Sequence, residues 1–172
     1  MAKKKRKSNK AEKIIESSIT SKLIYLVVTL VFFILANMYL TDLLLEEMEL
    51  GLTVVNPVFS LKYVQNTGAA FSILENYPYA IIALAVIALI IVLVYTINNL
   101  KTLSMKAIFC SSLLMSGVFC NLYERIFLGF VRDFIRLNFV DFPVFNFSDI
   151  SINVAVLFII ILLLSKDTLK NI

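Results

Sequence analysis

Four long apolar runs, separated by polar segments, dominate the hydrophobic pattern of the chain. A helix that crosses a bilayer needs about 20 predominantly apolar residues. The pattern therefore predicts an integral membrane protein built as an all-α bundle of four transmembrane helices. The expected spans are residues 23–40, 77–97, 105–123 and 150–165. The third run contains serines and a glycine, which favours a place inside the bundle because small residues let helix backbones approach closely.

The segments outside the runs differ from one another in composition. Residues 50–74 carry β-branched and aromatic residues at short intervals with turn-forming residues between them, which predicts two or three short strands. We expect these strands to form a small extracytoplasmic β-sheet on the outer membrane surface. Residues 124–149 are expected to be an extracytoplasmic loop. Residues 1–22 are a basic tail, unstructured over the first 20 residues, and residues 166–172 are a second tail, so one domain spans 23–165.

Positive charge indicates how the spans are oriented. Eight of the 16 Lys and Arg residues lie within residues 1–22, and four further lysines are Lys101, Lys106, Lys166 and Lys170. With four spans, these positions fall on one side of the membrane, and Lys and Arg in short loops favour the cytoplasm. Both termini are therefore expected to be cytoplasmic. The first run is too long for the apolar part of a typical signal peptide, and we interpret it as a retained anchor.

The composition narrows the possible chemistry. Hydrophobic residues make up 60% of the 172 residues, against roughly 45–50% in soluble domains. There is no histidine, and Cys110 and Cys120 lie in an apolar run. A disulfide framework and a Ser-His or Cys-His catalytic pair are excluded. A His/Cys metal site is disfavoured, and we expect no metal and no cofactor. The basic tail adjoins a span, so we expect a membrane flank and no nucleic acid as partner.

Three carboxylates before the fourth run are candidates for chemistry, because acids are costly near a bilayer. Asp133 and Asp149 flank Pro143, and a chain that leaves the membrane surface and returns could bring them face to face. Two carboxylates at hydrogen-bond range share a proton, so one can draw a proton from water while the other donates to a substrate carbonyl. This pattern favours an aspartyl hydrolase. Asp141 is a competing partner, which we expect at an exposed turn.

Other roles would also explain the two aspartates. Asp149 could be the N-cap or a first-turn residue of the fourth helix, where the helix dipole favours a carboxylate. Asp133 could form an ion pair with Arg125, Arg132 or Arg136. A small membrane transporter or an ion-relay subunit would instead need acids near the middle of the bilayer. Both aspartates fall at span ends, and the first two spans contain no acid.

Further polar residues could position a substrate. Asn121 and Arg125 are four residues apart and share a face at the end of the third helix, where an arginine can hold a carbonyl or a carboxylate. Asn66, Gly68 and Asn146 lie in predicted loops and could present amide or backbone donors. By composition alone, Arg125 could instead be an arginine at the membrane interface whose charged end reaches water. The three loop residues could be ordinary turn residues.

Three blocks of sequence carry a family resemblance. They are "NTGAAFS" at 66–72, "NLYER" followed by "LGFVRDFI" within 121–135, and "FPVFNFSD" at 142–149. In these blocks, and in their order between four spans, the chain resembles the lipoprotein signal peptidases (signal peptidase II), aspartyl proteases of bacterial membranes. The resemblance covers residues 23–165 and implies a multi-pass protein of the bacterial cytoplasmic (inner) membrane.

The resemblance also implies the site and the substrate. Asp133 and Asp149 occupy the family's "VVDF" and "FNxAD" positions, which implies that they are the catalytic dyad. The residues implied to line the site are Asn66, Gly68, Asn121, Arg125 and Asn146. The implied substrate is a prolipoprotein that is cut just before a cysteine already carrying diacylglycerol. We expect a monomer in contact with membrane lipid, with its active site facing outward.

The chain departs from the family pattern at several positions. Glu124 and Cys120 stand where the family usually has Asp and Gly, and Ser148 stands where it usually has Ala. At the end of the first span, Asn37 and Thr41 replace two charged residues. Both aspartates of the dyad are retained, which favours an active enzyme over an inactive protein of the same fold.

Overall fold

The computed structural model describes the backbone of residues 2–68 and 77–165, and the side chains from residue 18 onward. Within these residues it contains four helices and two strands, which are α1 Ala2–Glu49, β1 Phe59–Asn66, α2 Pro78–Asn98, α3 Met105–Phe127, β2 Val131–Leu137 and α4 Phe147–Leu164. Each helix holds a stretch long and apolar enough to cross a membrane. The predicted bundle of four transmembrane helices with a small sheet is confirmed.

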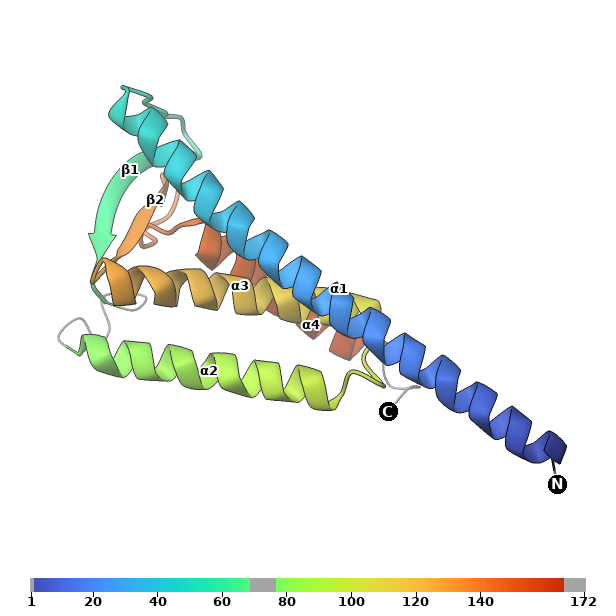
Figure 1. Cartoon of the computed structure of the whole chain (residues 1–172). Coiled ribbons are helices and arrows are strands. Elements are labelled where there is room, and N and C mark those ends of the chain that lie inside the picture. The colour runs from blue at the N-terminus through green and yellow to red at the C-terminus, as the bar shows by residue number, and fades with distance from the viewer. Residues whose placement is uncertain (1, 69–76, 166–172) are drawn as a thin grey trace.

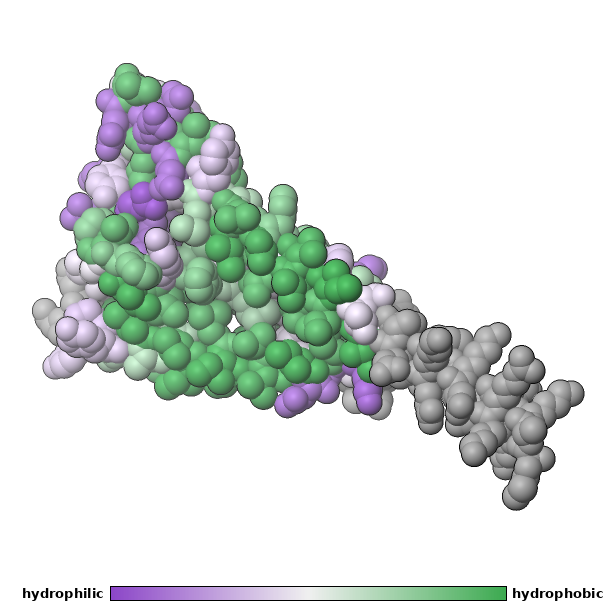
Figure 2. Space-filling model, in the orientation of Figure 1, coloured by the Kyte–Doolittle hydropathy of each residue, from purple (hydrophilic) through white to green (hydrophobic). Residues whose placement is uncertain are grey.

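The helix α3 forms the centre of the bundle. The helix α2 runs beside it, α4 lies behind it, and α1 crosses it obliquely (Figure 1). Half of the most apolar part of α3 is buried, against 11% in each of the other three helices. This agrees with the prediction made from its small and polar residues. Figure 2 shows the apolar surface as a broad band over the helices, with hydrophilic residues gathered at the two ends of the bundle.

The first helix is longer than predicted at both ends. No Gly or Pro precedes Gly51, so nothing in the local sequence interrupts the helix before it. The expectation of an unstructured tail over the first 20 residues is therefore wrong, since the helical backbone begins at Ala2. The helix ends where Gly51 adopts a φ of 104°. The Leu52 N–H then donates to the Glu47 carbonyl at 2.9 Å, and the Gly51 N–H donates to the Met48 carbonyl at 3.2 Å.

Capping side chains set the starts of α3 and α4. Ser104 accepts a hydrogen bond from the Ala107 N–H at 3.2 Å, which starts α3 where the apolar run begins. The helix α4 starts three residues before the predicted position, because Asn146 and Asp149 form a reciprocal capping box. The helix α3 also extends past its predicted end. Both helices therefore take residues from the segment that was expected to be a loop.

The sheet differs from its prediction. Within the described part of residues 50–74 only β1 is a strand, and it pairs antiparallel with β2, which lies in the expected loop 124–149. The local pattern could not reveal this pairing, since the hydrogen bonds of the sheet join segments far apart in sequence. Residues 69–74, which the strand prediction also covered, lie outside the described residues. The register places Val64 opposite Asp133 and Asn66 opposite Val131.

Close packing between α3 and α4 fixes the start of α4. A Cβ built on Gly117 would lie 2.5 Å from the carbonyl oxygen of Ser148 and 2.8 Å from a side-chain carbon of Ile152. Only a glycine allows the two helix backbones to approach this closely. The first turn of α4, including the residue after Ser148, is therefore held against the C-terminal half of α3.

Candidate active site

The carboxyl group of Asp133 is buried at the centre of the site. Its strand β2 runs beside β1, and the residue is only 1% exposed. The side-chain amide of Asn66, at the end of β1, donates to Asp133 Oδ2 at 2.8 Å. The amide of Asn146 donates to Asp133 Oδ1 at 2.9 Å. Both carboxyl oxygens thus have a neutral donor, as a buried polar group requires.

The carboxyl group of Asp149 lies in the first turn of α4. Asp149 Oδ2 accepts the backbone N–H of Asn146 at 3.1 Å, and the Asp149 N–H donates to Asn146 Oδ1 at 3.0 Å. Asn121, on α3, donates from its amide to Asp149 Oδ1 at 2.8 Å. Asp149 is therefore a first-turn residue, one of the two positions considered for it, while the N-cap itself is Asn146. This role does not remove Asp149 from the site.

Asn146 joins the two aspartates. Its side chain donates to Asp133, and its backbone N–H donates to Asp149. The same amide also donates to Asn121 Oδ1 at 3.1 Å. Asp133 on β2 and Asp149 on α4 are thus brought together in space, with hydrogen bonds to one asparagine between them.

The surroundings of Asp133 disfavour its negative charge. Burial raises the pKa of Asp133 to about 7, and the negative charge of Asp149 acts in the same direction. The amides of Asn66 and Asn146 and the charge of Arg125 oppose this rise in the pKa. A carboxyl group with a pKa near 7 can hold or release a proton near neutral pH, which general acid–base catalysis requires.

Arg125 ties Gly68, which follows β1 closely, to α3. Its guanidinium donates to the Gly68 carbonyl at 2.8 Å and to the Asn121 carbonyl at 3.1 Å. The Gly68 N–H donates to Asn66 Oδ1 at 3.0 Å, so the same asparagine that binds Asp133 also binds Gly68. An arginine at the membrane interface that serves only to reach water would not make these contacts.

All seven site residues expected from the sequence belong to this one hydrogen-bonded network. They are Asn66, Gly68, Asn121, Arg125, Asp133, Asn146 and Asp149. Asp141, the competing acid, is exposed as expected. Part of the "NTGAAFS" block, residues 69–72, lies outside the described residues.

Residues 24–165 match the family model described as "Signal peptidase (SPase) II". The chain belongs to the signal peptidase II family. This confirms the resemblance seen in the three sequence blocks. The protein is accordingly a protease and a multi-pass bacterial membrane protein.

Relatives and solved structures agree with this family. A lipoprotein signal peptidase of Streptococcus thermophilus is 39% identical over 110 residues, which cover 64% of this chain and 71% of the relative. One from Halothermothrix orenii is 33% identical over 151 residues, covering 84% of this chain and 97% of the relative. A solved structure described as a bacterial membrane enzyme is 28% identical with a TM-score of 0.70, covering 81% of this chain and 87% of that one.

The departures of this signal peptidase II from the family pattern have defined contacts. Asn37 is buried on α1 and donates to the Phe33 carbonyl at 3.0 Å and to the Ser151 hydroxyl at 3.3 Å. A neutral contact therefore joins α1 to α4 where a charged residue was expected. Cys120 is buried against α1, with its sulfur 3.9 Å from the Ile34 carbonyl.

Sequence reasoning missed one group of residues beside the site of this signal peptidase II. Arg132 was considered as a partner of Asp133, but its guanidinium pairs with Glu124 at 2.7 Å and with Asp42 at 2.8 Å. Glu124 was noted only for its departure from the family. The sequence does contain a clue, since Arg132 takes a position at which the family motif has Val.

Proposed function

We propose that this signal peptidase II is an aspartic endopeptidase that cleaves the signal peptide of lipoprotein precursors, with Asp133 and Asp149 as its dyad. The observation that supports the proposal is that Asn146 binds both carboxyl groups at the end of the bundle where α4 begins. The absence of histidine from the sequence leaves carboxyl groups as the natural acid and base.

Asp133 is proposed to hold the proton in the resting site. Its burial and its raised pKa, about 7, support this assignment. Asp149 lies at the N-terminus of α4, where free N–H groups and the helix dipole favour a carboxylate. Asp149 would therefore be the base and Asp133 the acid.

The reaction follows from these two roles. Asp149 takes a proton from water while the water oxygen attacks the scissile carbonyl carbon, and Asp133 donates its proton to the carbonyl oxygen. In the tetrahedral intermediate the carbonyl oxygen has become a hydroxyl. As this intermediate collapses, Asp149 gives its proton to the leaving nitrogen, the C–N bond breaks, and Asp133 recovers its proton from the hydroxyl.

Arg125, Asn121 and Gly68 are proposed to hold the substrate backbone. Among the described residues, the Nε–H of Arg125 is buried and has no partner. A buried donor of this kind is costly unless it is paired, so it is suited to a substrate carbonyl. The contact between Arg125 and the Gly68 carbonyl holds Gly68 near Asn66, which binds Asp133.

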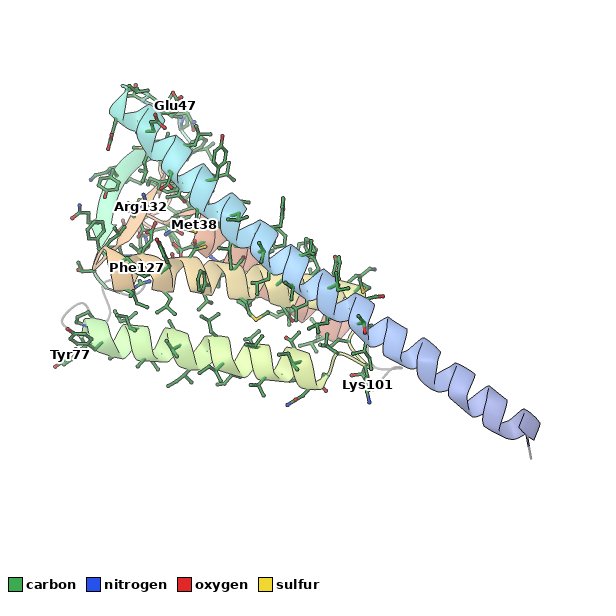
Figure 3. All side chains as sticks on the ribbon, viewed as in Figure 1. Met38, Glu47, Tyr77, Lys101, Phe127 and Arg132 are labelled. Atoms are coloured by element: carbon green, nitrogen blue, oxygen red, sulfur yellow. The ribbon has the colours of Figure 1, made fainter. Side chains whose placement is uncertain are left out.

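We further propose that both termini are cytoplasmic, that the site faces outward, and that the enzyme acts as a monomer. Lys101 lies at the end of the bundle opposite Arg132 and the sheet (Figure 3), and lysines in short loops favour the cytoplasm. A site at the outer interface would let the diacylglyceryl chains stay in lipid while the peptide enters from water. The lipid anchor would then supply part of the proximity effect.

A cleavage assay on one lipoprotein precursor, prepared with and without its diacylglyceryl group, tests the proposal. The wild type is expected to cleave only the lipidated form. Asp133→Asn and Asp149→Asn are each expected to lower the rate by at least about 10³-fold while remaining folded. A near wild-type rate in either variant would disprove the dyad, and equal cleavage of both forms would disprove lipid dependence. An inactive wild type would favour the inactive-protein alternative.

A further inference from the structure

The strand β2 is anchored on both sides of Asp133. After it, the N–H groups of Phe134 and Ile135 donate to the Phe145 carbonyl at 3.1 and 2.9 Å. Before it, the backbone N–H of Arg132 donates to Glu124 Oε2 at 2.8 Å. The position of Asp133 therefore depends on anchors at both neighbouring residues, one of which comes from a side chain of α3.

Glu124 is buried and contacts both the backbone N–H and the guanidinium of Arg132. In addition to the backbone contact, Arg132 Nε donates to Glu124 Oε1 at 2.8 Å, and Nη2 lies 2.7 Å from the same oxygen. The Glu124 side chain is only 11% exposed. Charge-assisted hydrogen bonds to a guanidinium are strong and fix its orientation. Figure 3 shows Arg132 where β2 lies between α1 and α3.

The second ion pair of Arg132 has a different environment. Arg132 Nη1 lies 2.8 Å from Asp42 Oδ1, at the end of α1, but the Asp42 side chain is 63% exposed. Exposed ion pairs contribute little because water screens them. Of the two acids that bind Arg132, only Glu124 also binds its backbone.

Glu124 and Arg125 are neighbours at the end of α3 and serve two different segments. Arg125 holds Gly68, just after β1, through its carbonyl, and Glu124 holds β2 through Arg132. Both segments contribute to the surroundings of Asp133, since Asn66 lies at the end of β1. The valine that the family motif has before its aspartate could not give Glu124 the side-chain contact that Arg132 gives.

We infer that Glu124 is a positioning residue for the reaction: it holds Arg132 so that Asp133 stays aligned with Asn66 and Asn146. The inference rests on the proposed function of Asp133. Glu124 would not touch the substrate, so its effect should fall on the chemical step and leave substrate binding unchanged.

The test compares Glu124→Gln with Asp42→Asn in the cleavage assay on the lipidated precursor, with rates normalised to folded enzyme. Glutamine keeps the shape of Glu124 but cannot accept from both the backbone and the guanidinium of Arg132. We expect kcat to fall about tenfold or more, because small misplacements of a catalytic group are costly, with KM within about twofold. Asp42→Asn breaks the exposed pair of the same arginine, and its kcat is expected to stay within about twofold of the wild type.

Each outcome decides a separate point. An unchanged kcat in Glu124→Gln, or an equal loss in Asp42→Asn, overturns the positioning role, as does a loss confined to KM. If Glu124→Gln does not fold, Glu124→Asp keeps the charge and withdraws the carboxylate, and the same loss in kcat is expected. Measuring Asp133→Asn in parallel separates the proposed dyad from the proposed role of Glu124. An active Asp133→Asn would overturn the dyad but would not show that Glu124 fails to hold Arg132.

Discussion

The side-chain amide of Asn146 lies 2.9 Å from Asp133 Oδ1, while the side-chain oxygen of the same residue caps α4. One residue therefore has two separable tasks. Serine caps a helix about as well as asparagine but is too short to reach as far, so Asn146→Ser should retain the cap and lose the contact with Asp133.

We predict that Asn146→Ser lowers kcat by about 10²-fold with little loss of stability. Asn146→Ala should lose a similar amount of activity and, in addition, about 1 kcal/mol of stability because the cap is removed. Steady-state kinetics and thermal unfolding in detergent measure the two effects. Similar kcat values for Asn146→Ser and the wild type would show that the contact with Asp133 has no part in the chemistry.

The pH dependence of stability should report the burial of Asp133. The pKa of Asp133 is raised to about 7 in the folded protein from 3.8, so the folded state binds the proton more tightly than the unfolded state does. The stability contributed by this proton is fully present below pH 3.8 and is lost as the pH rises through about 7. Asp133→Asn has no carboxyl group to ionise here, so it does not lose this stability at high pH. Its unfolding temperature should exceed that of the wild type at pH 8, and the difference should be smaller at pH 5.

The exposed Asp141 supplies a matched control for this experiment. Asp141→Asn removes the same charge in the segment between β2 and α4 without a burial cost. Its unfolding temperature should follow that of the wild type across the pH range. If both variants change the pH profile equally, the effect comes from net charge and not from the buried carboxyl group.

Lys22 is predicted to stabilise the end of the bundle opposite the site. Its ammonium group donates to the carbonyls of Leu100, Lys101 and Leu103 at 3.0, 3.0 and 2.8 Å. Hydrogen bonds to a charged group are stronger than neutral ones, so Lys22→Met should cost roughly 1–2 kcal/mol of stability with kcat unchanged. Lys101→Met, an exposed lysine at the same end, should cost less than about 0.5 kcal/mol. Equal costs would mean that the three carbonyl contacts add nothing.

Gly117→Ala should separate α3 from α4. The added methyl group would overlap the Ser148 carbonyl, and overpacking of this kind typically costs about 1–3 kcal/mol. Because Asp149 follows Ser148, kcat should fall as well. Ser116→Ala, on the same helix, removes a hydroxyl that bonds within α3 and adds no bulk, so kcat should be retained. A fully active and stable Gly117→Ala would show that the helices can move apart without cost.

The long spans could be predicted because each follows from a local run of apolar residues and does not depend on distant parts of the chain. The helix α2 lies within one residue of the predicted 77–97, since an apolar run in lipid must satisfy its own backbone hydrogen bonds. The start of α4 was harder to predict, because it depends on the side chains of Asn146 and Asp149, which lie before the apolar run.

The strand β2 could not be predicted in the same way. Arg132, Asp133 and Arg136 interrupt its apolar pattern, and its partner β1 lies far away in sequence. The candidate site residues could be identified from motifs, but their contacts could not. Spacing alone does not show that Asn146 binds both carboxyl groups or that Arg132 binds Glu124 in place of Asp133.

If Asp149 belongs to the dyad as proposed, its position in the first turn of α4 makes the thickness of the bilayer relevant to the rate. The helix has 18 residues, and at 1.5 Å per residue it is about 27 Å long, slightly less than the roughly 30 Å of a typical hydrocarbon core. A thicker membrane would pull this span inward or thin around it, and Asp149 would move with its helix while Asp133 stays on the separate strand β2. Lipid chain length would thus act on the alignment of the two acids, which makes the surrounding lipid a control on turnover and not merely a solvent.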